Sequence, residues 1–136
     1  EEDEDNLPHK VIDGALIALA AIFKASYGKA DFDDLISTWF KEMPVLLDDP
    51  DSNVAFEVLH TFFMDKNPQV FNPNSMTHLL RCCSVAIRMK KISDEIKEQI
   101  ILLLKEVFSV EEMIDIIQEA IASLTVEDRK SIQNVI

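Results

Sequence analysis

The segment from Lys66 to Asn74, KNPQVFNPN, separates two long apolar stretches and constrains the fold more than any other part of the chain. A residue before proline is pushed out of the helical region, so Asn67 before Pro68 ends one helix. Asn72 is a good N-cap, and Pro73 fits the first turn of the next helix because its missing N–H is not needed there. The short connection predicts two neighbouring helices, which we expect to run antiparallel.

Similar start and stop signals divide the rest of the chain. Ser93 is predicted to cap the start of one helix. Ser109 with Glu112 is a predicted capping box for another. Thr125 with Asp128 is a weaker box for the last. The helices are expected at residues 8–25, 31–43, 52–66, 73–89, 93–108, 109–123 and 125–136.

Apolar residues recur at three- and four-residue steps in these segments, as in helices that bury one face. The predicted buried face of the second helix is Phe32, Leu35, Ile36, Trp39, Phe40 and Met43. That of the third is Ala55, Val58, Leu59, Phe62 and Phe63. That of the fourth is Met76, Leu79, Leu80, Cys83 and Ile87. For Trp39 a place in the core is favoured over an exposed one, from which it would stack on a partner.

Helix pairs begin near residues 8, 52 and 93, and a period of roughly 40–47 residues is typical of HEAT or armadillo solenoids. The chain has only two glycines, which disfavours sheets with tight turns. We therefore predict an all-α fold, a HEAT-repeat superhelical solenoid of about seven helices in antiparallel pairs. Its predicted parts are an acidic disordered tail at 1–7, helix pairs at 8–44, 51–90 and 93–124, and a C-terminal capping helix at 125–136.

The first helix is apolar on nearly all sides, because the run 14–23 has no polar side chain. This run is shorter than the about 20 residues that span a bilayer, so protein must cover it on more than one side. We interpret the chain as the C-terminal end of a longer solenoid whose upstream repeats covered Leu16, Leu19, Ala20 and Phe23. In isolation this cut N-terminal face would be exposed or hidden in a dimer. The alternative is a compact helical domain that covers its own first helix.

Few residues point to catalysis or metal binding. His9, His60 and His78 are scattered, and no nucleophile, phosphate-loop or dinucleotide motif is present. We therefore expect no enzyme activity, no cofactor and no metal. The adjacent Cys82 and Cys83 suit a reducing intracellular compartment. The net charge of −12 would repel phosphate backbones, so nucleic acid is not an expected partner. Because the apolar run is too short to span a bilayer, a membrane is not expected either.

Three motifs, in order along the chain, resemble those of one family. Trp39–Pro44 (WFKEMP) is similar to the Trp, then Leu-Pro, that ends a B helix in that family. Asn67–Val70 with Pro73-Asn74 is similar to its short connector before the next helix. Leu124–Glu127 with Ile132-Gln133 is similar to its closing helix. Together these motifs resemble the C-terminus of the importin-β (karyopherin-β) family, nearest the importin beta-3 branch.

The resemblance implies a nuclear transport receptor, a HEAT solenoid that carries protein cargo with basic signals through the nuclear pore. Such a receptor works in the cytoplasm and the nucleus and passes the nuclear envelope in transit. The resemblance also implies cargo on the concave face, Phe-Gly nucleoporins on the outer face, and Ran-GTP on N-terminal repeats outside this chain. The alternative is a HEAT scaffold protein, such as a phosphatase regulatory subunit or a coat-type subunit.

Acidic residues supply the candidate cargo-binding site. In a HEAT solenoid the second helix of each pair lines the concave side, which here means the second, fourth and sixth helices. The acids predicted on this side are Asp33, Asp34, Glu42, Glu111, Glu112, Asp115 and Glu119. The fourth helix instead offers His78, Arg81 and Arg88. Two acidic patches around a basic one would suit a cargo of alternating charge, and the alternative is an ordinary solvated surface.

Overall fold

The computed structural model describes residues 2–26 and 32–136, with side chains from Val11 onward. The described residues contain seven α-helices and no strand, which confirms the predicted all-helical class. The helices are α1 (Glu2–Ser26), α2 (Asp33–Glu42), α3 (Asn53–Met64), α4 (Met76–Arg88), α5 (Asp94–Phe108), α6 (Ile114–Ser123) and α7 (Val126–Gln133). Short 3-10 turns η1 (Pro50–Ser52), η2 (Pro73–Ser75) and η3 (Glu111–Met113) precede α3, α4 and α6. Among the described helices, none is long and apolar enough to cross a membrane.

The N-terminal acidic run is part of α1. This helix begins at Glu2, so the prediction of a disordered tail is wrong for residues 2–7, and residue 1 lies outside the described part. Acidic residues in a first helical turn are stabilised by the partial positive charge of the unpaired backbone N–H groups. The same composition that suggested a solvated tail therefore suits the start of a helix.

The predicted stop before Pro68 takes the form of a C-terminal helix cap. α3 ends at Met64, and the next residues turn back on it. The N–H of Lys66 donates to the carbonyl of Phe63 and the N–H of Asn67 to that of Phe62, both at 2.9 Å. This is a Schellman motif, and Lys66 has a φ of 57° at the position where glycine is usual.

The predicted start of the next helix is confirmed. The side-chain oxygen of Asn72 accepts a hydrogen bond from the N–H of Ser75 at 3.0 Å. Pro73 is the first residue of η2, which leads directly into α4. The local chemistry of the Asn-Pro pair therefore sets this boundary.

Two of the other predicted caps are also present. The hydroxyl of Ser93 accepts from the N–H of Ile96 at 3.3 Å and begins α5. The hydroxyl of Thr125 accepts from the N–H of Asp128 at 3.1 Å and begins α7. Both residues have the extended backbone that an N-cap requires.

The predicted capping box of Ser109 and Glu112 is wrong. The Ser109 hydroxyl donates to the carbonyl of Glu106 at 2.7 Å, so it bonds the last turn of α5 instead of starting a new helix. The following turn η3 starts after Val110 and has no side-chain cap. A serine hydroxyl can serve either neighbouring helix, and here the C-terminal carbonyl of α5 is its partner.

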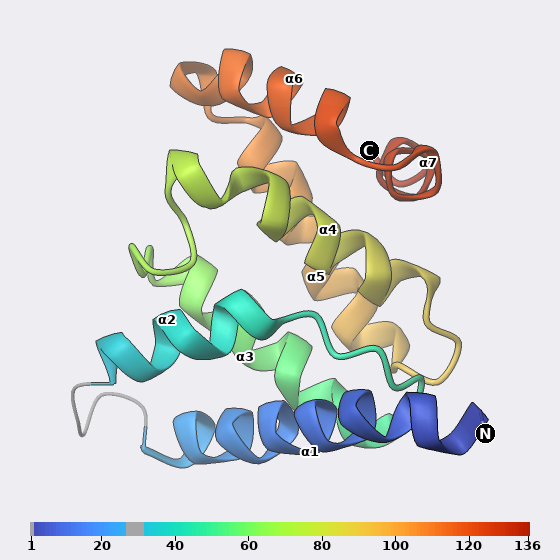
Figure 1. Ribbon diagram of the computed structural model, residues 1–136. Coiled ribbons are helices and arrows are strands. Elements are labelled where there is room, and N and C mark those ends of the chain that lie inside the picture. The colour runs from blue at the N-terminus through green and yellow to red at the C-terminus, as the bar shows by residue number, and fades with distance from the viewer. Residues whose placement is uncertain (1, 27–31) are drawn as a thin grey trace.

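Several helices pack on partners that are not their neighbours in the sequence. α1 packs on α3, and α3 packs on α5, while α4 packs on α5, α6 and α7 (Figure 1). Figure 1 shows α1 at one end of the molecule and α6 with α7 at the other. α4 therefore has helices on several sides, which explains why Cys82, Cys83 and Ser84 are all buried in addition to its predicted stripe.

The aromatic core joins α1, α2 and α3. The rings of Phe23, Trp39 and Phe62 meet pairwise with centroids 5.6–5.9 Å apart. The indole N–H of Trp39 donates to the carbonyl of Leu16 at 3.0 Å, and Trp39 is buried as predicted. In contrast, Leu35 on the predicted stripe of α2 is exposed.

We predicted that upstream repeats cover Leu16, Leu19, Ala20 and Phe23 on α1, and for these residues the prediction is wrong. Leu16, Ala20 and Phe23 are buried in the chain's own core, and Leu19 is half-buried. The chain thus covers this side of its first helix with Trp39 and the helices around it. Because α1 is apolar on nearly all sides, its sequence did not reveal which side faces the core.

Side chains also tie the loops after α2 and α4 to other parts of the chain. Asp13, which is buried on α1, accepts from the N–H of Leu46 in the loop after α2. Asp48 in that loop accepts from the N–H groups of Lys90 and Lys91 in the loop after α4, at 3.0 and 2.7 Å. These two backbone hydrogen bonds lower the pKa of Asp48.

Candidate interaction surfaces

The predicted cargo-binding acids are exposed but do not form one strip. Asp33 and Asp34 line a hollow at the start of α2. Glu112 lines a second hollow near the ends of α3 and α5, and Glu119 a third beside the start of α4. Glu42, Glu111 and Asp115 are exposed outside these hollows.

The hollow near the ends of α3 and α5 combines apolar and acidic side chains. Its volume is about 370 Å³, and its lining includes the rings of Phe63 and Phe71, with centroids 5.0 Å apart. Glu106 and Glu112 contribute carboxylates, and Lys66 contributes one ammonium group. Such a hollow can hold a side chain with an aliphatic stem and a cationic end, as in lysine or arginine.

Glu106 was not among the predicted site residues. It lies on α5, the first helix of its predicted pair, whereas the predicted site residues belong to second helices. The chain turns at Ser109 and brings Val110 and Glu112 back beside Glu106. The charge pattern along the sequence gives no sign of this proximity.

A larger hollow follows one face of α4. It has a volume of about 510 Å³, and its α4 lining consists of Thr77, Arg81, Val85 and Arg88. Leu46 from the loop after α2 and the connection between α6 and α7 complete it. Of the predicted basic residues on α4, Arg81 and Arg88 line this hollow and His78 does not.

The basic side chains of α4 differ in their surroundings. Arg88 contacts the carboxylate of Asp128 at 2.6 Å and that of Glu127 at 3.6 Å. The ring of His78 donates to the carbonyl of Phe40 at 2.6 Å and lies against the Phe40 ring. Arg81 is exposed and makes no ion pair with the described side chains. Among the basic side chains of α4, Arg81 is therefore the one that stays free of described carboxylates and can meet an external anion.

Asp128 is the buried end of this network. Its carboxylate accepts from Arg88 at 2.6 Å and from the hydroxyl of Ser84 at 2.8 Å. Burial acts to raise the pKa of Asp128, but the hydrogen bonds from Arg88, Ser84 and Thr125 outweigh it, and the pKa lies below its ordinary value. The network holds α7 on α4 and is structural.

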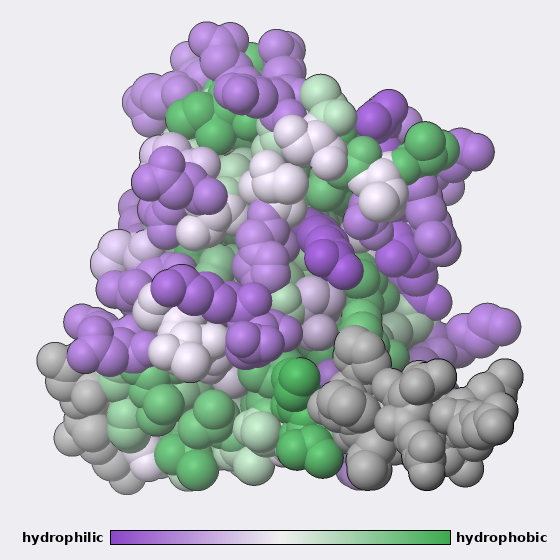
Figure 2. Space-filling model, viewed as in Figure 1, coloured by the Kyte–Doolittle hydropathy of each residue, from purple (hydrophilic) through white to green (hydrophobic). Residues whose placement is uncertain are grey.

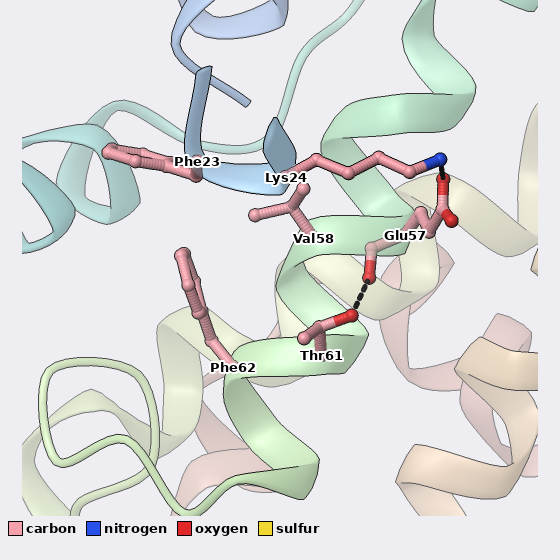
Figure 3. Close-up of a pocket in the computed structure, with 6 residues that line it drawn as sticks. All are labelled: Phe23, Lys24, Glu57, Val58, Thr61 and Phe62. Carbon is pink, nitrogen blue, oxygen red and sulfur yellow. Dashed lines mark hydrogen bonds and ion pairs between the residues drawn. The ribbon is translucent and has the colours of Figure 1, made fainter. Parts of the chain in front are cut away.

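A smaller crevice lies between α1 and α3. It has a volume of about 180 Å³ and is lined by Phe23, Phe62 and Val58 together with polar groups at one side (Figure 3). Lys24 reaches over Val58 to Glu57, with the ammonium and carboxylate 3.0 Å apart (Figure 3). The Thr61 hydroxyl at the same crevice donates to the backbone carbonyl of Glu57 at 3.1 Å (Figure 3).

Three further titratable groups have shifted pKa values in the described part of the chain. Burial raises the pKa of the thiols of Cys82 and Cys83, so they remain protonated and unreactive. Burial also lowers the pKa of His60. Within residues 11–26 and 32–136, no group of three or more His, Cys, Asp or Glu side chains is placed to hold a metal ion.

Comparison with protein-family models, with curated proteins and with solved structures finds no match for this chain. Three features are available for binding: the exposed acids, the hollow at the ends of α3 and α5, and Arg81 in the hollow along α4.

Proposed function

We propose that this chain is the C-terminal part of a nuclear transport receptor of the importin-β family and that it contributes to the binding of basic protein cargo. The receptor would be a HEAT solenoid that works in cytoplasm and nucleus under the control of Ran-GTP. Ran-GTP would bind repeats outside this chain, and Phe-Gly nucleoporins would contact the outer face. Nucleic acid and membranes are not part of this proposal, nor is catalysis.

The observation that carries the proposal is the stacking of the helices. α1, α3 and α5 contact one another in succession, as first helices of stacked pairs would (Figure 1). The side chain of Asp13 on α1 bonds the backbone of Leu46 in the loop after α2, and the side chain of Asp48 in that loop bonds the backbone of Lys90 in the loop after α4. The side-chain amide oxygen of Asn53 likewise accepts from the N–H of Ser93, which links the starts of α3 and α5. This repetition supports a solenoid of pairs.

The charge distribution supports a basic partner. Exposed carboxylates occur on α2, η3 and α6, and the chain carries a net charge of −12. Opposite charge accelerates the encounter of two proteins more than it tightens the complex. A cargo segment rich in lysine and arginine would be attracted to these faces, and Glu106 and Glu112 would receive one cationic side chain in their hollow.

The test measures the affinity of a labelled peptide rich in lysine and arginine by fluorescence anisotropy at several salt concentrations. One variant reverses four predicted acids: Asp33→Lys, Asp34→Lys, Asp115→Lys and Glu119→Lys. Because each exposed pair contributes about 0.2–1 kcal/mol, we expect affinity to fall by about tenfold or more and the salt dependence to flatten.

A control variant carries the same change in net charge at other exposed acids: Asp51→Lys, Asp65→Lys, Asp94→Lys and Glu98→Lys. We expect it to bind the peptide more tightly than the test variant. Equal affinity and salt slope in the two variants would show that the predicted faces are ordinary solvated surface. Circular dichroism of both variants checks that helicity is unchanged.

The alternative, a scaffold function, is favoured by one observation. One side of α1 is exposed and has no charged side chain; its described residues are Val11, Gly14, Ala15, Ala18, Ala21, Ile22 and Ala25. Scaffold proteins use such surfaces to hold other helical proteins. Failure of the basic peptide to bind the unmodified chain would favour this alternative.

A further inference from the structure

The side of α1 that faces away from α3 is exposed and wholly apolar in its described part. It consists of Val11, Gly14, Ala15, Ala18, Ala21, Ile22 and Ala25, all of them exposed. Val11 is 65% exposed and Ile22 is 49% exposed. Figure 2 shows hydrophobic residues gathered along the lower edge of the molecule, where Figure 1 places α1. We call these residues the outer face of α1.

Such a face is unusual for a surface helix. Surface helices of globular proteins carry polar or charged residues opposite their buried stripe, and larger exposed apolar patches mark interaction sites. Here the core side of α1, with Leu16, Ala20 and Phe23, is already buried in the chain. The outer face lies opposite that stripe, and the described residues leave it uncovered.

The spacing along the outer face is that of a helix-pairing seam. Its residues recur at steps of three and four, with Val11, Ala18 and Ala25 separated by seven positions each. A seven-residue repeat of apolar positions is the pattern by which two helices pack along their length. Most of the residues are small, so a second helix can approach α1 closely. The expected partner is therefore an α-helix with a similar apolar seam.

The face is complementary to itself when two copies run antiparallel. Ala18 lies at its middle, both along the helix and around it. A twofold axis through Ala18 places Val11 opposite Ala25 and Ile22 opposite Gly14. In each of these pairs a larger side chain meets a small residue. Gly14 has open space where a Cβ would be, with nothing within 4 Å, so the Ile22 side chain of the other copy can fill it.

A parallel arrangement does not give this fit, because it would set Ile22 against Ile22 and leave Gly14 facing Gly14. From the spacing and the size complementarity we infer that two copies of this chain associate through the outer faces of their α1 helices, antiparallel, with Ala18 on the twofold axis. The inference concerns the chain of 136 residues and does not rest on the proposed function.

The expected association is weak. The outer face covers residues 11–25, which is about 22 Å of helix at 1.5 Å per residue. Stable dimers usually bury about 1,200 Å² or more in total, and one pair of helices lies at or below that limit. We therefore expect dissociation in the micromolar range, with the dimer favoured at high protein concentration.

Sedimentation equilibrium of the full chain, from about 1 to about 500 μM, tests whether a dimer forms. Ala18→Glu places a carboxylate on the axis, and we expect it to weaken association by about a hundredfold or more, because the charge would be buried without a partner. The matched control is Leu102→Glu, which adds the same charge on α5 at a side chain that is 60% exposed. The control should dimerise like the unmodified chain. A monomer at every concentration would overturn the inference.

A pair of size changes tests the antiparallel register. A Cβ at position 14 meets no heavy atom within 4 Å, so Gly14→Leu should make the monomer more helical and at least as stable. In the dimer, Leu at position 14 would collide with Ile22 of the other copy and weaken association. Adding Ile22→Ala to Gly14→Leu should restore it, because the large and small positions are then exchanged. Failure of the double variant to regain affinity would contradict this register.

Cysteine cross-linking locates the axis. In Ala18→Cys the two new thiols would lie on the axis within reach of each other, and mild oxidation should link the two copies. In Ala25→Cys the two thiols would be about 21 Å apart along the helices, so no link should form. The native Cys82 and Cys83 are fully buried and do not compete. Efficient linking through position 25 and not through position 18 would exclude the proposed arrangement.

Discussion

At the scale of single residues, Asp128 shows how one buried charge fixes the end of the chain. It is 4% exposed, and its carboxylate holds Arg88 and Ser84 of α4. The hydroxyl of Thr125 also accepts from its backbone N–H. One residue therefore completes the cap of α7 and fastens that helix to α4. The sequence indicated the cap, but it did not indicate the contact with α4.

Asp128→Asn should destabilise the chain near neutral pH by about 2–3 kcal/mol, because it leaves Arg88 without its closest partner. The folded protein lowers the pKa of Asp128 below its ordinary value of 3.8. Its charge therefore contributes stability that is complete above about pH 4 and is lost as the pH falls through the folded pKa. Urea unfolding of both proteins between pH 7 and pH 2.5 measures the difference. A difference that does not shrink at the acidic end would contradict this role.

At the scale of elements, the helix ends show which boundary signals are local. Asn72, Ser93 and Thr125 each bond a backbone N–H three residues ahead, so their function depends on their immediate neighbours alone. Ser109 has a helix on both sides and bonds the earlier one. Where a capping residue lies between two helices, the path of the chain determines which helix its side chain bonds.

The turn after α3 offers a test at this scale. Lys66 adopts a φ of 57°, which is unfavourable for a residue with a side chain. Lys66→Gly should stabilise the protein by about 1 kcal/mol, because glycine adopts this conformation without steric conflict. Lys66→Ala is the matched control, since it removes the same charge and keeps the Cβ. Thermal unfolding in which both variants gain equally would mean that charge, and not backbone conformation, is responsible.

At the scale of the whole molecule, stability depends on contacts that pass from one helix to the next. α3 packs on both α1 and α5, and α4 packs on α5, α6 and α7. Phe62 of α3 meets Phe23 of α1 and Trp39 of α2 in the aromatic core. Removing one side chain of α3 therefore weakens contacts with helices on both sides.

Phe62→Ala should destabilise the chain by about 3–5 kcal/mol, because it removes a buried ring and leaves a cavity. Trp39 is the only tryptophan in the sequence, so its fluorescence reports on the α1–α3 end, while far-UV circular dichroism reports on all helices. We expect the two signals to change together in one unfolding transition. Separate transitions would show that the α1–α3 end unfolds independently.

Features that depend on neighbours within a few residues can be predicted from the sequence alone. These are the helical class, the approximate helix positions, the Asn-Pro start of η2 and α4, and the buried stripe of α3. Helix periodicity and capping chemistry are local, so they can be recognised without knowledge of the fold.

Which side of each helix is covered depends on its packing against the rest of the chain. The sequence of α1 offers two apolar sides, and packing against the rest of the chain buried the one with Phe23 and left the one with Ala18 exposed. Phe63 and Phe71 line one hollow together with Glu106 and Glu112, which lie far from them in the sequence. Exposure and proximity depend on neighbours far away in the sequence, and no local pattern encodes them.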